Sequence, residues 1–314
     1  MIKRIQNQVT GSRLTLPVVI FYGIGIWLLC GLLQKQLWVQ FACFALSTYL
    51  VVQINNVYAL IRIYSRMVSV AFIFLSCMVC FLFPSIEDAI AQLCILSGLM
   101  TLLSTYQDKD TIGRLFYTFV FIGLGSLADI HLLWNAPLFW IISAFFIYSL
   151  SWRGFFASCL GLILPYWFMG AWVLWQHGFD FSIVRAHFAP LAEFHSPITY
   201  ETLPLPYYLS FAFIVILQIT GIIHFLRTSF NDKLRTRQFY YTFIFLDLTV
   251  TILLAIQPQH YDLLIREMII FTSPLIGHFI SLTHTRITNI AFYVIAAIAL
   301  ILTAINLWNS SSIF

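Results

Sequence analysis

Hydrophobic positions along this chain fall into long runs separated by short polar segments. A helix needs about 20 mostly apolar residues to cross a bilayer, and fewer where interfacial anchors flank it. Eleven runs fit that requirement, at approximately 14–33, 37–54, 67–83, 89–105, 115–128, 134–150, 154–175, 206–226, 239–256, 263–282 and 290–307. The pattern predicts an all-α, polytopic transmembrane helical bundle of about eleven spans, with residues 1–314 forming a single integral membrane domain.

Composition points to the same class of protein. Hydrophobic residues make up 61% of the chain and charged residues only 9%, and the mean hydropathy is +0.91. A soluble domain has roughly 25% charged residues, so this chain has too few charges to cover a water-facing surface. We therefore expect the lipid bilayer as its partner. We expect no nucleic-acid binding, because the basic residues are spread over short loops with no domain to present them.

The basic residues predict how the helices are threaded, because Lys and Arg are retained in cytoplasmic loops. With the N-terminus inside, thirteen of the sixteen basic residues fall in cytoplasmic segments, and only Lys35, Arg185 and Arg266 fall outside. This bias predicts a cytoplasmic N-terminus and a periplasmic C-terminus. It is typical of a multi-pass protein of the bacterial inner membrane.

One long polar segment, 176–205, interrupts the apolar pattern and is predicted to be a long periplasmic loop. Its ionisable residues are His177, Asp180, Arg185, His187, Glu193, His195 and Glu201. Its apolar residues recur on one side of a helical projection, which predicts an amphipathic helix on the outer leaflet for part of it. Pro190 is expected to end or bend that helix.

Other loops on the predicted outer side bring further acids and imidazoles to this segment, namely Glu87, Asp88, Asp129, His131, His260 and Asp262. Such groups can transfer protons, because their pKa values can be tuned toward neutrality near a low-dielectric boundary. Arg185 adds a fork-shaped cation suited to phosphate. The candidate catalytic residues are therefore Asp129, His131, Asp180, Arg185, His187 and His195. The alternative is a solvated loop with ordinary polar residues, which the exclusion of basic residues from this side also predicts.

Motifs for cofactors and metals are missing from the sequence. The spacing of His187 and His195 matches no compact zinc motif, and there is no HExxH. There is also no Walker motif, no dinucleotide-binding GxGxxG and no GxSxG. We therefore expect neither a metal nor a cofactor. Gly123, Gly125 and Ser126 are spaced for close helix packing rather than for holding phosphate.

Asp247 is the one acid predicted to lie in the middle of a span. An unpaired charge there costs about 3 kcal/mol or more, so intramembrane acids are candidate functional sites. Asp247 is predicted either to carry a proton or an ion, or to pair with His224 or His278. A third alternative is a neutral Asp247 that is hydrogen-bonded to a Thr or Ser.

Residues 55–168 carry a family resemblance in a series of short pieces: Asn55-Asn56, Phe83-Pro84, Leu102-Leu103 with Tyr106, the run 122–127, Pro137, Trp152-Arg153, Leu160-Gly161 and the run 165–168. In their order and spacing the chain resembles an uncharacterised family of multi-pass inner-membrane proteins common in Bacteroidota. That resemblance implies a location and no reaction. The paired helices ending at Arg153 also resemble polytopic glycan polymerases and lipid-linked-sugar glycosyltransferases, which commonly use acidic, Arg or His residues on outer loops.

Three functions follow from these features. The first is action on lipid-linked glycan or envelope intermediates at the periplasmic face, with a polyprenyl-linked glycan as the partner, and it rests on the acid and histidine residues with Arg185. The second is a transporter or flippase that uses Asp247. The third is a non-enzymatic subunit of an envelope complex. The sequence does not identify a protein partner.

Overall fold

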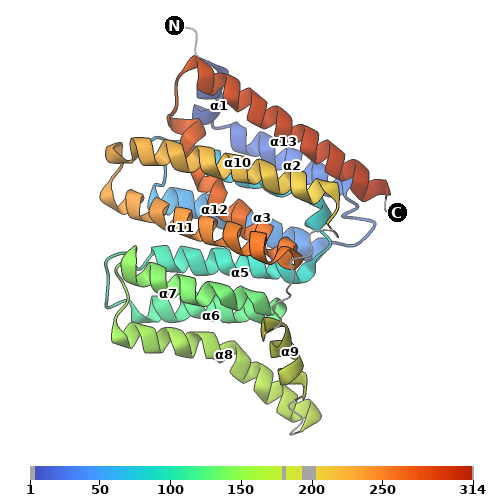
Figure 1. Cartoon of the computed structure of the whole chain (residues 1–314), viewed down its shortest axis with the longest axis vertical. Helices are drawn as coiled ribbons and strands as arrows, with labels where there is room; N and C mark the ends of the chain where they lie inside the picture. Colours follow the sequence, from blue (N-terminus) through green and yellow to red (C-terminus); the bar gives the residue numbers. More distant parts are fainter. Residues whose placement is uncertain (1–3, 179–181, 193–202, 313–314) are drawn as a thin grey trace.

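The computed structural model describes residues 4–178, 182–192 and 203–312, and within them the chain is all helical (Figure 1). Short 3-10 helices lie at four of the connections, at η1 (Cys80–Leu82), η2 (Ile130–Trp134), η3 (Ser229–Asn231) and η4 (Pro258–His260). The α-helices are α1 (Ile5–Gly11), α2 (Thr15–Leu29), α3 (Trp38–Tyr58), α4 (Met67–Met78), α5 (Ile86–Leu103), α6 (Ile112–Ala128), α7 (Asn135–Phe145), α8 (Trp152–His177), α9 (Ser182–Ala192), α10 (Leu205–Thr228), α11 (Leu234–Ile256), α12 (Tyr261–Leu282) and α13 (Arg286–Ser312).

Helix length and composition agree with a membrane protein. Within the described ranges, seven helices are long and apolar enough to cross a membrane, namely α3, α5, α8, α10, α11, α12 and α13. The pair α1 and α2, bent by 89°, would make an eighth. Helices α4, α6 and α7 are apolar but shorter, and they coincide with three of the predicted runs. The all-α class is confirmed, whereas the number of crossings stays a prediction.

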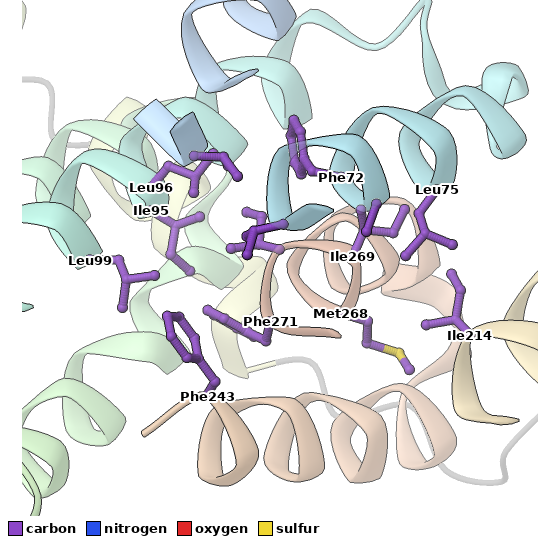
Figure 2. Packing of buried hydrophobic residues seen from close by; sticks show 14 of the residues in the cluster. Phe72, Leu75, Ile95, Leu96, Leu99, Ile214, Phe243, Met268, Ile269 and Phe271 are labelled. Atoms are coloured by element: carbon purple, nitrogen blue, oxygen red, sulfur yellow. The ribbon is translucent and has the colours of Figure 1, made fainter. Parts of the chain in front are cut away.

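Helix α12 lies in the middle of the bundle. Every residue from Glu267 to Ser281 is buried. Side chains from α4, α5, α10 and α11 converge on it, and Figure 2 shows Phe243 of α11 pointing toward Phe271. A helix that is enclosed on all sides has neither water nor headgroups beside it. Its polar side chains must therefore find partners on neighbouring helices.

The two ends of the bundle carry different connections (Figure 1). The α9 end holds α9, η1, η2, η4 and the end of α13. The α1 end holds α1 and the connections at 59–66, 104–111, 146–151, 229–233 and 283–285. Hydrogen bonds join distant segments at the α1 end, where Gln6 Nε2 donates to the Ile280 carbonyl oxygen at 2.7 Å. Helix α1 and the end of α13 lie at opposite ends of the bundle.

The segment predicted as a long loop is partly helical. Helix α8 continues to His177, α9 occupies Ser182–Ala192, and α10 begins at Leu205. Helix α9 fits the predicted amphipathic helix and packs on η2. Pro190 lies inside its last turn. Within the described part of 176–205, the chain is therefore helical at Ser182–Ala192, as the amphipathic pattern predicted.

Helices α6 and α8 pack closely because glycines remove side chains where the two backbones meet. A Cβ at Gly161 of α8 would run into the Phe116 carbonyl oxygen of α6. A Cβ at Gly123 of α6 would lie 2.6 Å from the Leu162 carbonyl oxygen of α8. Small residues at such contacts let membrane helices approach each other. The predicted packing role of Gly123 is confirmed.

Replacement of Gly161 by Ala should destabilise the protein by about 1–3 kcal/mol, because the added methyl group must displace the α6 backbone. The melting temperature of the purified protein in detergent measures this loss. Gly170→Ala, on the same helix, is the matched control, since a Cβ there meets nothing within 4 Å. Equal melting temperatures for the two variants would contradict the close packing.

Candidate functional site

Asp129 and His131 form a hydrogen-bonded pair at the α9 end, where α6 ends and η2 begins. Asp129 Oδ1 accepts the backbone N–H of His131 at 2.9 Å and lies 2.9 Å from His131 Nδ1. Burial alone would raise the pKa of Asp129, but the hydrogen bonds from His131 and the nearby imidazoles hold this pKa below its ordinary value. The ionised carboxylate accepts the Nδ1 proton. Nε2 is then the basic nitrogen of His131.

His260 joins this pair from the connection between α11 and α12. Its ring centroid lies 3.7 Å from that of His131 and 5.3 Å from that of Trp134. Its imidazole is close enough for its charge to act on Asp129. The structure thus brings together three residues, Asp129, His131 and His260, that the sequence places in two loops on one predicted side.

Glu267 of α12 supplies a second carboxylate. Asn135, the first residue of α7, donates from Nδ2 to Glu267 Oε1 at 2.7 Å. Both side chains are buried, and Asp129 is close enough for its charge to act on Glu267. The sequence analysis missed both residues as site candidates. The available signal was an ionisable residue inside an apolar run, which marks functional sites in membrane proteins.

Arg266, the residue before Glu267, contacts a different part of the bundle. Its guanidinium donates from Nη1 to Gln92 Oε1 at 3.0 Å and from Nη2 to the Leu82 carbonyl oxygen. Asp88 and Asp262 are close enough for their charges to act on it. These bonds join α12 to α5 and η1, so Arg266 fixes the position of the first turns of α12 beside Glu267.

Helix α9 is held at this end by aromatic contacts. His187 and Phe188 pack against Tyr166 of α8, with ring centroids 6.0 and 5.1 Å apart. Tyr166 Oη in turn lies 2.6 Å from Ser126 Oγ, near the end of α6 that leads to Asp129. These contacts place α9 against η2.

The remaining candidates in the 176–205 segment differ in how they are placed. Arg185 is exposed on α9, and His187 is half-buried on the same helix. Asp180 and His195 lie outside the described residues. Of the six candidate catalytic residues, the structure therefore brings Asp129 and His131 into direct contact and places Arg185 and His187 on the helix that packs on η2.

Three buried polar atoms of this group have no hydrogen-bond partner within the described part of the chain: His131 Nε2, Asn135 Oδ1 and Glu267 Oε2. Their residues are only 8%, 2% and 1% exposed. A buried polar atom without a partner costs about 1–3 kcal/mol unless a water molecule, an ion or a ligand satisfies it. The group therefore offers one basic nitrogen and two acceptor oxygens to a molecule that carries hydroxyl groups.

Asp247 is fully buried in the middle of α11. Its two carboxylate oxygens lie 3.1 and 2.9 Å from Thr272 Oγ1 of α12. The predicted alternative of a pair with His224 or His278 is therefore wrong, and a hydrogen bond to a threonine is found instead. The physical reason is that both histidines lie about a helix turn or more nearer the α1 end, where His278 has another partner.

That partner is Asp232, in the connection between α10 and α11. His278 Nε2 lies 3.1 Å from Asp232 Oδ2, and His278 Nδ1 lies 3.4 Å from His224 Nδ1. Arg62 reaches within 3.9 Å of Asp232 Oδ1. The α1 end therefore has a buried acid and histidine group of its own. Among the residues that the structure describes, no three His, Cys, Asp or Glu side chains are grouped to hold a metal ion.

Replacement of Asn135 by Ala should destabilise the protein by about 1–3 kcal/mol, because Glu267 Oε1 would lose its donor while staying buried. Glu267→Gln keeps the side-chain oxygen that accepts from Asn135, so its melting temperature should match that of the wild type. Thermal unfolding in detergent at neutral pH measures both. An unchanged Asn135→Ala protein, or equal losses in both variants, would contradict this hydrogen bond.

Comparison of the chain with protein-family models, curated proteins and solved structures found no match. The resemblance to a Bacteroidota membrane family and the likeness to glycan polymerases therefore stay predictions from sequence pieces. What the protein does has to be inferred from the residues gathered at the α9 end and along α12.

Proposed function

We propose that this protein is an inner-membrane enzyme that acts on lipid-linked glycan or envelope intermediates at its α9 end. The observation that carries the proposal is the Asp129–His131 pair, whose buried Nε2 has no partner within the described residues. An imidazole that a carboxylate orients through Nδ1 is a well-suited general base. Glu267 and Asn135 beside it supply acceptors for substrate hydroxyl groups.

The proposal includes a threading of the chain through the membrane. Eleven crossings, with the N-terminus in the cytoplasm and the C-terminus in the periplasm, place the α9 end outside. Two observations support this. An odd number of crossings agrees with α1 and the end of α13 lying at opposite ends of the bundle (Figure 1). The basic residues are concentrated in connections at the α1 end, as cytoplasmic retention requires.

The proposed reaction is a glycosyl transfer. His131 Nε2 takes the proton of an acceptor hydroxyl group, and the hydroxyl oxygen attacks the anomeric carbon of a sugar carried on an isoprenoid diphosphate. The new carbon–oxygen bond forms as the bond from that carbon to the diphosphate oxygen breaks, and the diphosphate leaves with the electron pair. Arg185 on α9 binds the phosphate groups, because its planar guanidinium can donate two parallel hydrogen bonds to phosphate oxygens.

A second function, proton-coupled transport, is favoured by a separate observation. Protonatable side chains lie on α12 or in contact with it at three depths. Glu267 of α12 lies near the α9 end, Asp247 of α11 contacts Thr272 in the middle, and His278 of α12 lies near the α1 end. Buried ionisable residues at successive depths are typical of proton relays in pumps and transporters.

The enzyme proposal predicts that His131→Gln and Asp129→Asn abolish complementation of a deletion strain without lowering the protein level. The readout is the profile of polyprenyl-linked glycans by mass spectrometry, with immunoblots for abundance. Loss of a general base lowers rates by about 10²–10⁴. His284→Gln is the matched control, since His284 is exposed at the α1 end and bonds to Asn7. A normal glycan profile in both site variants would refute the proposal.

The transport alternative predicts that Asp247→Asn abolishes proton flux in proteoliposomes, measured with a trapped pH dye. Asparagine keeps an oxygen for Thr272 but cannot exchange a proton at neutral pH. Thr249→Val is the control, because the Thr249 hydroxyl donates to the Phe245 carbonyl oxygen of its own helix. Equal flux in wild type, Asp247→Asn and protein-free vesicles would exclude a proton path through Asp247.

A further inference from the structure

A cavity of about 470 Å³ opens between six helices on the side of the bundle away from the α6–α8 pair. Its walls come from α1, α2, α4, α10, α12 and α13 and are almost wholly apolar, with Val18, Val70, Phe74, Ile276, Phe292 and Ala296 among the lining residues. Protein interiors are packed with few voids larger than a water molecule. The volume falls in the range of about 300–1,000 Å³ that ligand pockets occupy, so this space is too large to be a packing defect.

The cavity is confined to the half of the bundle nearest the α1 end. On α2 and α13 its lining residues come from the first half of each helix, at 15–19 and 292–299, and on α12 they come from the second half, at 276–280. On α4 they come from 67–75, from the first residue to within one turn of the last. Phe213 and Leu217 of α10 line it near mid-helix. A molecule that enters it therefore reaches from one membrane surface to about the centre of the bilayer.

Polar lining residues occur at one place, the corner between α1 and α2, where Gln8, Ser12 and Thr15 meet the cavity. The chain bends by 89° at this corner. Helix α1 is fixed there by hydrogen bonds from Gln6, whose backbone N–H donates to Asn289 Oδ1 of α13 at 3.1 Å and whose Nε2 donates to Thr283 Oγ1 at 2.9 Å. The cavity thus has a polar rim at this corner, where hydrogen bonds hold α1 in place.

The charge around this polar rim is positive. Arg4 precedes α1, Arg13 lies at the bend, and Arg286 begins α13, whose first turns contact α1. Neither residues 1–86 nor residues 268–314 contain an Asp or Glu. An anionic group is therefore attracted to the rim, while the apolar walls below it offer a polar ligand no hydrogen bonds.

We propose that the cavity binds one acyl chain of an anionic phospholipid from the membrane leaflet at the α1 end, with the lipid phosphate at Arg13. An apolar cavity stays free of water and takes up apolar ligands. The acyl chain gains the contacts of the walls, and the phosphate gains charge-assisted hydrogen bonds from the guanidinium. This site is independent of the group around His131 and of the function proposed for it.

The test is native mass spectrometry and lipid extraction of protein purified from membranes in mild detergent. The wild type should retain phosphatidylglycerol in preference to phosphatidylethanolamine. Ala296→Phe fills the cavity and should lose the retained lipid, whereas Ala297→Phe, on an exposed face of the same helix, should keep it. Equal lipid retention in the two variants would overturn the proposal.

The headgroup is tested separately. Arg13→Gln should remove the preference for phosphatidylglycerol, and Arg153→Gln, an exposed arginine of α8 at the same end, should not. An Arg13→Gln protein with the wild-type preference would overturn the role of Arg13.

A third measurement uses unaltered protein, so it does not depend on a variant that folds. Phosphatidylglycerol with a photoreactive acyl chain should crosslink to peptides of α4 and α13. Crosslinks spread evenly over the exposed faces of α8 and α11 would show nonspecific contact with bilayer lipid and would contradict a specific lipid site in the cavity.

Discussion

The burial of α12 is the constraint on which the rest of the structure depends. A membrane helix with no lipid-facing side can keep polar side chains only if other helices satisfy them. Three buried polar residues along α12 accordingly have partners on other segments: Glu267 with Asn135 of α7, Thr272 with Asp247 of α11, and His278 with Asp232. These bonds set the register of α7 and α11 against α12. The apolar residues between them fill the core (Figure 2).

This constraint also separates two kinds of chemistry. At the α9 end, His131 Nε2, Asn135 Oδ1 and Glu267 Oε2 have no hydrogen-bond partner among the described residues, which suits a reacting ligand. At the α1 end, both ring nitrogens of His278 lie near hydrogen-bonding atoms of Asp232 and His224. These contacts join α10, α12 and the connection between α10 and α11. His131 and His278 thus differ in how far their hydrogen-bonding capacity is used, because only His131 has a ring nitrogen without a partner among the described residues.

Much of the helical architecture could be predicted from the sequence, because apolar runs of this length have few alternatives in a membrane. The proximity of His131 and His260 was also predictable, because both residues lie in loops on the same predicted side of the membrane. The partner of Asp247 could not be predicted, because hydropathy indicates how deep a residue lies in the membrane but not which neighbouring helix its side chain faces. Asn135 was missed for a related reason: it stands at the start of an apolar run, where a polar residue is ordinary. Its contact with Glu267 depends on how α7 packs, which periodicity alone does not specify.

The boundary between the α5–α9 part of the bundle and the α10–α12 part runs through the candidate site. Helix α8 packs chiefly on α6, and α6 on α5, so these helices form a stack beside the rest of the bundle (Figure 1). At the α9 end this stack meets its neighbour through the ring contact of His131 with His260 and the hydrogen bond of Asn135 with Glu267. The acid–base group is therefore composed of side chains from both parts, and its geometry depends on how the two parts pack together.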